Sequence, residues 1–286
     1  MRLFLLGVAA CLVFKKLSAV KKRNNDSIRT KGDILVATRI HMAETTRPPN
    51  LAGIKNFLLS AQHYGSRVAI AVGVKDQRSL ELNELVASVR KEVSKACVSI
   101  PVDVIPVTPW GRFVPALNAL LAHAVCTSCP LILYQSLEME VESTAIHSLR
   151  QQLEDGSVCV AGAALPGHAY DAGRKVMLAG NTTPWNTLAL WRVSTLALTG
   201  FLSVADGPNG LDGGVEEVSA IATLQKLVAS EAGAVLIQLP GLEWKTDFDD
   251  PQRAKWHEKK MASKVARPAA HLGAIGLSGF GAVFHV

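Results

Sequence analysis

The sequence predicts an α/β protein: a single domain built on a mostly parallel, doubly wound sheet flanked by helices. Short apolar runs alternate with longer helical patterns at least four times between residues 34 and 161. This alternation is typical of parallel strands joined by crossover helices. The composition agrees, because 49% of the 286 residues are hydrophobic and a chain of this length can bury a sizeable core.

Each element is predicted from a local pattern. Short apolar runs indicate buried strands, and they occupy residues 34–38, 68–73, 102–107, 131–134 and 158–161, with later strands at 175–179 and 235–239. Apolar residues at helical spacing indicate helices over residues 50–61, 80–96, 113–125, 143–153, 188–198 and 216–229. Residues 39–49 and 204–214 are predicted as loops because they are polar or rich in Gly, Asp, Pro and Asn.

The chain divides into three predicted parts. Residues 1–31 form a hydrophobic signal or anchor followed by a basic linker, 32–243 the folded domain, and 244–286 a charged C-terminal extension. The apolar run at residues 3–14 is shorter than the roughly twenty residues of a spanning helix, and it fits a signal peptide or short signal-anchor. It predicts membrane association and a secretory or Golgi address, with organelle targeting as the alternative.

Charge and cysteine content exclude several classes of partner. The net charge of +6 is concentrated near the two ends of the chain, without interleaved aromatic residues, which argues against a nucleic-acid partner. Cys126 and Cys129 have no second Cys or His pair at zinc-site spacing. The sequence also contains no P-loop, GxGxxG motif or Ser-His-Asp order, which argues against a P-loop NTPase, a Rossmann dehydrogenase and a hydrolase.

Polar residues follow several predicted strands. Ligands of open α/β sheets bind beyond the carboxyl ends of the strands, so these residues are candidates for a nucleotide site. They are Thr38, Arg39, Asp76, Arg112 and Glu138. Arginine pairs with phosphate, so Arg39 and Arg112 are expected to contact a diphosphate, and Asp76 a base or ribose. The alternative is that such residues are common at strand ends in any α/β domain.

An acidic pair, Glu216 and Glu217, follows Gly213-Gly214-Val215 and opens a predicted helix. A carboxylate held at a helix start behind a glycine loop suits a general base acting on a bound hydroxyl. The alternative is structural, since acids in the first helical turn are stabilised by the helix dipole.

From about residue 34 to 227, the order of elements resembles the GT-A fold of family-2-type glycosyltransferases. The segment with Arg192, Gly200-Phe201 and Glu216-Glu217 is similar in order and spacing to that family's acceptor segment. The resemblance implies that Glu217 is the base of an inverting transfer and that Glu216 orients it. Trp185 and Asn186, in the preceding loop, are expected to bind substrate, although Trp185 is equally compatible with a place in the core.

The family's metal motif, Asp-x-Asp, corresponds here to Ser136-Leu137-Glu138. The resemblance implies Mg²⁺ or Mn²⁺, with Glu138 as the remaining carboxylate ligand. On an extended segment, Glu138, Glu140 and Glu142 would share one face. The alternative is a solvated edge strand.

The resemblance therefore implies a glycosyltransferase that moves a sugar from a nucleotide-diphosphate sugar to a hydroxyl of a glycan, lipid or protein. Two alternatives stay open at this point. A catalytically inactive GT-A-like binding protein agrees with the altered metal motif, and a sugar-phosphate nucleotidyltransferase shares the sheet architecture.

Overall fold

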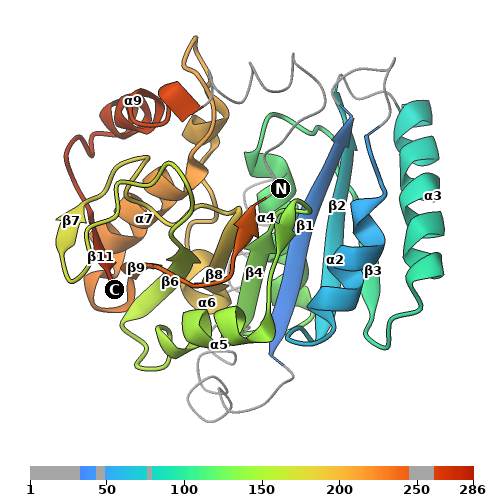
Figure 1. Cartoon of the computed structure of the whole chain (residues 1–286). Helices are drawn as coiled ribbons and strands as arrows, with labels where there is room; N and C mark the ends of the chain where they lie inside the picture. Colours follow the sequence, from blue (N-terminus) through green and yellow to red (C-terminus); the bar gives the residue numbers. More distant parts are fainter. Residues whose placement is uncertain (1–32, 43–48, 76–78, 245–260) are drawn as a thin grey trace, which may run out of the picture.

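The computed structural model describes residues 33–42, 49–75, 79–244 and 261–286. Figure 1 shows a layered molecule in which strands from both halves of the chain lie side by side between helices. The strands are β1 (Ile34–Met42), β2 (Arg67–Val74), β3 (Val102–Pro106), β4 (Leu131–Gln135), β5 (Met139–Glu140), β6 (Val158–Ala163), β7 (Lys175–Met177), β8 (Leu188–Arg192), β9 (Gly233–Ile237), β10 (Glu243–Trp244) and β11 (Ala282–His285). The helices are α2 (Gly53–Ala61), α3 (Ser79–Ala96), α4 (Val114–Cys126), α5 (Ser143–Gln151), α6 (Val193–Leu196), α7 (Glu216–Leu227) and α9 (Ala266–Ala274), with short 3₁₀ turns η2 (Ser203–Asp206) and η3 (Ala229–Glu231).

Nine of these strands form one sheet in the order β3-β2-β1-β4-β8-β6-β9-β11-β7. On one side of β8, the strands β3, β2, β1 and β4 are parallel to one another, and on the other side so are β6, β9 and β11. The strand β8 between them runs antiparallel to both of its neighbours, β4 and β6. The edge strand β7 is also antiparallel to its neighbour. The predicted α/β class, with a mostly parallel sheet in a single domain, is confirmed.

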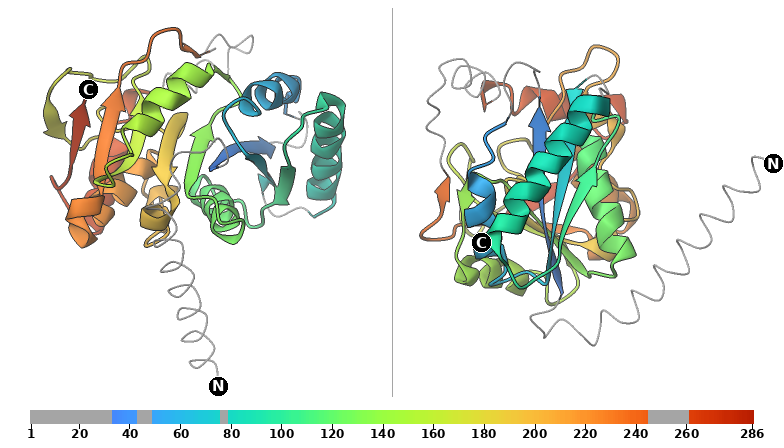
Figure 2. Two further views of the ribbon diagram at one scale, coloured as in Figure 1. Left: turned by 90° about the horizontal axis from the view of Figure 1, so that it is seen from below. Right: turned by 90° about the vertical axis from the view of Figure 1, so that its right-hand side faces the viewer.

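Helices cover both faces of this sheet, as a parallel sheet requires. Figure 2 shows α2 and α5 on one face and α4 and α7 on the other. All five residues of β4 and all five of β8 are buried, so the centre of the sheet lies in the middle of the core. The polar residues that do occur there, such as Gln135, are therefore held by specific partners: Gln135 Oε1 accepts a hydrogen bond from the Tyr64 hydroxyl at 2.8 Å.

The structure corrects two local predictions in this sheet. Residues 188–198 were expected to be one helix, but they form β8 followed by the single turn α6. A strand that is buried on both faces is apolar throughout, so its sequence lacks the alternation that identifies a strand. Residues 39–49 were expected to be a polar loop, but β1 continues to Met42 by pairing with β2 as far as Val74.

The acidic segment after β4 also differs from expectation. Glu138, Glu140 and Glu142 do not share one face of an extended segment, because β5 contains only two residues and Glu142 already precedes α5. Glu140 and Glu142 are exposed and Glu138 is half-buried. Only Glu138 therefore reaches the pocket described below.

The ends of the chain bear on the predicted domain limits. Residues 1–32, with the predicted signal or anchor, lie outside the described residues, and the address inferred from them stays a prediction. Among the helices that the structure describes, none is long and apolar enough to cross a membrane. In the predicted C-terminal extension, 245–260 is likewise outside the description, whereas α9 packs on α7 and β11 lies between β9 and β7 in the sheet.

Candidate active site

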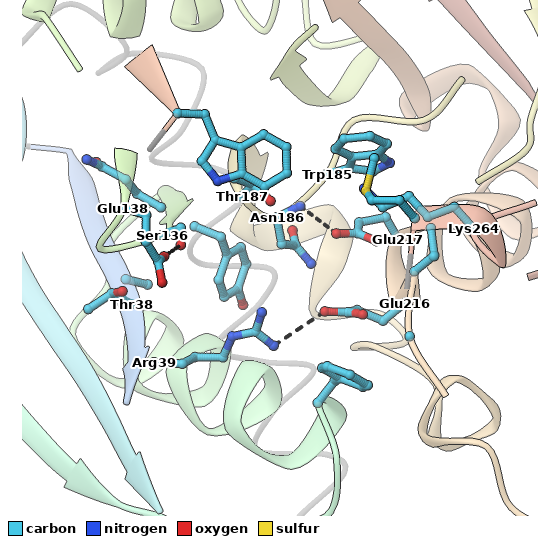
Figure 3. A pocket seen from close by; sticks show the side chains of 18 residues that line it. Thr38, Arg39, Ser136, Glu138, Trp185, Asn186, Thr187, Glu216, Glu217 and Lys264 are labelled. Carbon is cyan, nitrogen blue, oxygen red and sulfur yellow. Dashed lines mark hydrogen bonds and ion pairs between the residues drawn. The ribbon is translucent and has the colours of Figure 1, made fainter. Parts of the chain in front are cut away.

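A pocket of about 280 Å³ opens at the carboxyl end of β4, beside β1 and the start of α7. Its wall consists of Ala37, Thr38, Arg39, Phe113, Tyr134, Gln135, Ser136, Glu138, Trp185, Asn186, Thr187, Gly214, Val215, Glu216, Glu217, Trp244, Met261 and Lys264. The volume is close to the lower limit of small-molecule pockets, which begins at roughly 300 Å³. Segments more than two hundred residues apart in the sequence thus build one site (Figure 3).

The acidic pair forms part of the wall of this pocket. Glu216 and Glu217 are each only 4% exposed, and they form the first turn of α7. The loop before them is tightly constrained, since Gly214 has φ +112° and Val215 has φ +61°. A β-branched residue in the left-handed region is a true backbone outlier, and such strain is concentrated at functional sites.

The loop before α7 is fixed from two sides. Asp206 Oδ1 accepts the backbone N–H groups of Phe113 at 2.7 Å and Val114 at 2.8 Å, which caps the start of α4. On the other side, Arg267 of α9 donates from Nη1 to the Gly213 carbonyl at 2.6 Å. The position of the acidic pair is therefore set by helices that come from distant parts of the chain.

The Glu217 carboxyl has an unusual environment. Burial first, and the neighbouring Glu216 charge second, raise the pKa of Glu217 to about 8. The backbone N–H of Asn186, which donates to Glu217 Oε1, and the Lys264 charge act in the opposite direction. A carboxyl whose pKa lies near the working pH is suited to proton transfer.

Glu216 lies in contact with a cation at the pocket wall. Arg39 Nη1 lies 3.4 Å from Glu216 Oε1, and the two side chains are 29% and 6% exposed. Figure 3 shows Arg39 reaching from β1 toward Glu216, with the pocket between β1 and α7. Arg39, which was predicted to bind phosphate, thus contacts Glu216 of the predicted acidic pair.

Asn186 places a hydrogen-bond donor at the pocket wall. Its Oδ1 accepts the indole N–H of Trp191 at 2.9 Å, and because that indole can only donate, the orientation of the amide is fixed. The Nδ2 group is buried and has no hydrogen-bond partner in the structure. Buried polar groups in folded proteins are nearly always paired; Asn186 Nδ2 is one of six buried side-chain atoms without a partner among the described residues, and its place at the pocket makes it a candidate contact for a ligand.

Trp185 lines the pocket but is held by its neighbours. The His168 ring stacks on it with centroids 3.5 Å apart, and the Lys264 ammonium lies 2.7 Å from the Trp185 ring centroid. Burial is the main cause that lowers the pKa of His168 to about 4, so a neutral imidazole packs on the indole. Because the His168 ring and the Lys264 ammonium pack against it, Trp185 is 3% exposed, which leaves little of the indole accessible for the substrate binding expected of it.

The residues at the predicted metal position do not match a divalent cation site. The Ser136 hydroxyl donates a hydrogen bond to Glu138 Oε2, so the two side chains engage each other. Within 33–42, 49–75, 79–244 and 261–286, no three His, Cys, Asp or Glu side chains lie together so that they could hold a metal ion. Mg²⁺ prefers six oxygen ligands in octahedral geometry, and Glu138 supplies one carboxylate. The metal role of Glu138 stays a prediction that this donor set does not favour.

The structure brings most of the sequence candidates to one place. Arg112 is the exception: it is exposed and outside the pocket wall, and its backbone N–H donates to Asp206 Oδ2 at 3.3 Å. Asp76 lies outside the described residues. The remaining candidates all line the pocket, namely Thr38, Arg39, Glu138, Trp185, Asn186, Glu216 and Glu217.

Two residues at the site were missed by the sequence analysis. Lys264 is only 8% exposed, although its sequence neighbours form a basic cluster that indicates a solvated surface. Trp244 packs edge-on to Trp185, with ring centroids 6.2 Å apart, because β10 pairs with β5. The sequence signal was confined to Trp244, a large aromatic residue at the start of a charged segment.

Comparisons with known proteins give a remote similarity of fold. No protein-family model matches the sequence, and no curated protein matches it. The solved structure of S. aureus TarS 1–349 in complex with UDP-GlcNAc is 11% identical, with a TM-score of 0.42, and the match covers 81% of this chain and 66% of that one. For TarS 1–349 in complex with UDP the values are 11%, 0.39, 67% and 55%, and for the longer TarS structure 11%, 0.36, 59% and 30%. The chain thus spans less than two thirds of each of these structures, and its function has to be inferred from its own pocket.

Proposed function

We propose that this protein is a glycosyltransferase that moves a sugar from a nucleotide-diphosphate sugar to a hydroxyl acceptor, with inversion at the anomeric carbon. The observation that carries the proposal is the buried Glu216–Glu217 pair, which lines a pocket at the carboxyl end of a parallel sheet together with Arg39, 3.4 Å from Glu216. This is the edge at which open α/β sheets bind nucleotides. The remote resemblance of element order to GT-A enzymes is consistent with this proposal.

In the proposed reaction, the Glu217 carboxylate accepts the proton of the acceptor hydroxyl. The acceptor oxygen forms a bond to the anomeric carbon on the face opposite the nucleotide. The bond from the anomeric carbon to the diphosphate oxygen breaks, and the nucleoside diphosphate leaves with that electron pair. One displacement on one face inverts the anomeric centre, and Glu217 is the only base that the step needs.

The other pocket residues have supporting roles in this proposal. Glu216 keeps Arg39 turned toward the pocket through the 3.4 Å contact, and it raises the pKa of Glu217 toward neutrality. The unpartnered Nδ2 group of Asn186 supplies a donor for a substrate hydroxyl. Thr38 lies beside Arg39 on β1 and is proposed to contact the nucleotide.

The test is a panel of UDP-, GDP-, CDP- and ADP-sugars, with release of the nucleoside diphosphate as the readout. We expect turnover with one nucleotide class. Glu217→Gln should abolish it while leaving nucleotide affinity within about threefold, because the amide keeps the shape but is not a base. Glu84→Gln, at an exposed position of α3, is the matched control and should retain full activity.

Two results would contradict the proposal in different ways. Full turnover by Glu217→Gln would remove the assignment of the base. Failure of every nucleoside diphosphate to raise the melting temperature, with and without Mn²⁺, would remove the transferase and leave a GT-A-like binding protein. The altered metal position at Ser136-Leu137-Glu138 is the observation in favour of that second candidate.

A further inference from the structure

Two cationic side chains enter the pocket from opposite sides. Arg39 comes from β1, and Lys264 comes from the segment that leads into α9 (Figure 3). They are separated by 225 positions in the sequence, so nothing local places them together. Both line the same cavity as the acidic pair.

Lys264 is fixed rather than solvated. It is 8% exposed, and its ammonium group lies 2.7 Å from the ring centroid of Trp185 and 6.0 Å from that of Trp244. Contact with an indole face stabilises an ammonium group, more so when water is excluded. The positive charge is therefore held at the pocket wall before any ligand binds.

Arg39 is available to a ligand in a different way. A guanidinium group carries five N–H donors in a planar fork, which suits phosphate oxygens. Its contact with Glu216 at 3.4 Å is longer than the roughly 2.7–2.9 Å of a strong charge-assisted hydrogen bond. A phosphate oxygen can therefore compete for Arg39 at small cost.

The pocket also contains negative charge that a diphosphate would meet. Glu138 and Glu216 both line it, and the described residues around Glu138 do not form a site for a divalent cation. Without a positive counter-charge a diphosphate would be repelled from this cavity. Among the described residues of the wall, Arg39 and Lys264 are the basic side chains that can supply that charge.

We propose that Arg39 and Lys264, instead of a bound divalent metal, neutralise the diphosphate of the ligand in this pocket. The inference rests on the proposed function for the nature of the ligand, a nucleoside diphosphate. Preorganised cations at the diphosphate stabilise the charge that develops on the leaving group as the sugar departs. The altered metal motif is then a consequence of the protein's own cations, and it does not indicate loss of activity.

The experiment measures binding of UDP, GDP, CDP and ADP, and of the four monophosphates, by isothermal titration calorimetry. Each titration of the full chain is done in EDTA and again in MnCl₂. We expect at least one diphosphate to bind in EDTA, with Mn²⁺ changing its dissociation constant by less than about threefold. The corresponding monophosphate should bind more weakly, because it offers less charge to the two cations.

Charge variants test the two residues directly. Lys264→Met and Arg39→Gln should each weaken diphosphate binding by about tenfold or more, and monophosphate binding by less. Lys264→Arg, which keeps the charge, should recover most of the loss. Lys226→Met is the matched control, since Lys226 also lies over an aromatic ring, at 5.5 Å from the Phe280 centroid, but is exposed and outside the pocket wall.

The possible outcomes separate the two proposals. Diphosphate binding that requires Mn²⁺ would overturn the inference and leave the proposed transferase intact. Unchanged affinity in folded Lys264→Met and Arg39→Gln, judged by an unchanged melting temperature, would also overturn it. If Lys264→Met fails to fold, Lys264→Arg and Arg39→Gln still decide the question. Absence of diphosphate binding in both buffers would overturn both proposals.

Discussion

The carboxyl of Glu217 combines burial with a neighbouring acid, and the two effects act in the same direction. Burial, first, and Glu216, second, raise its pKa from 4.5 to about 8. Between these two pH values the folded protein keeps a proton that the unfolded chain releases. The free energy of unfolding therefore falls as the pH rises through this window. The same property would make Glu217, in its proposed role, a base that is active only when the solution is near or above neutrality.

The first prediction concerns pH. The specificity constant kcat/KM should rise up to about tenfold per pH unit below pH 8 and level off above it. The free energy of unfolding should fall with pH, relative to Glu217→Gln, between about pH 5 and 8. Initial rates and urea unfolding from pH 5 to 9 measure the two effects.

Glu216→Gln provides the internal check of this prediction. It removes the second cause of the shift, so the midpoint of the rate profile should move to lower pH. If the free energy of unfolding of the wild type and that of Glu217→Gln differed by the same amount at every pH, the raised pKa would be contradicted.

The second prediction concerns the unpartnered donor of Asn186. Asn186→Ala removes Nδ2 from the pocket and should raise KM or Kd for a substrate by roughly five- to hundredfold, the value of one buried hydrogen bond. Trp191→Phe removes the hydrogen bond to Oδ1 and leaves Nδ2 in place. It should lower the melting temperature with a smaller effect on affinity. Equal affinity losses in the two variants would show that Asn186 is a structural residue.

At the scale of the element, the sequence predicts best where the pattern is local. The strands β1 to β4 and β6, and the helices between them, were predicted, because short apolar runs and helical spacing alternate there; the two-residue strand β5 was not predicted. β8 was mistaken for a helix, since Leu188, Trp191 and Thr195 also lie at helical spacing. Its strand state is decided by β4 and β6, which pair with it on both sides.

The third prediction concerns the packing of β2 against the loop after β3. Trp110 lies directly on Gly73, where an added Cβ would come 1.8 Å from the indole. The indole also stacks on the His41 ring, with centroids 4.9 Å apart and the planes nearly parallel. Gly73→Ala should therefore displace Trp110 and lower the free energy of unfolding by about 1–3 kcal/mol.

Gly53→Ala is the matched control for this substitution. An added Cβ there meets only the Leu137 carbonyl at 3.7 Å, an ordinary contact, and Gly53 begins α2. Chemical denaturation should show little change or a small gain. Equal destabilisation by both variants would mean that the close approach at Gly73 is relieved without cost.

At the scale of the whole molecule, the site depends on contacts that no local pattern reveals. Arg39 was predicted from a strand end and the acidic pair from a helix start, whereas Asn186 was predicted from the loop of the acceptor-like segment. Lys264 and Trp244 were missed, because their place at the pocket depends on tertiary packing: Lys264 lies over the Trp185 ring, and Trp244 lies on β10, which pairs with β5. Arg112 was predicted to lie in the site because it follows β3. In the structure its backbone N–H donates to Asp206 Oδ2, and its side chain is exposed.

The last prediction concerns β11, which joins the C-terminal residues to the sheet. His285 is fully buried between β9 and the loop before β8. Its Nδ1 accepts the Asp171 N–H at 2.9 Å, and its Nε2 lies 3.0 Å from the Thr182 carbonyl. The loop that contains Thr182 continues to Trp185, which lines the pocket. The contacts of β11 therefore help to fix the position of the pocket wall.

His285→Ala should lower the free energy of unfolding by about 2–4 kcal/mol, because it leaves a cavity at a fully buried position and removes the hydrogen bonds to the backbone of Asp171 and Thr182. Phe284→Ala, one residue away on the same strand but 45% exposed, should cost less than about 1 kcal/mol. Urea denaturation measures both costs. Nucleoside diphosphate affinity should fall with His285→Ala and stay constant with Phe284→Ala, since only the first loosens the loop that carries Trp185. A stable His285→Ala protein with unchanged affinity would show that β11 closes the sheet without supporting the site.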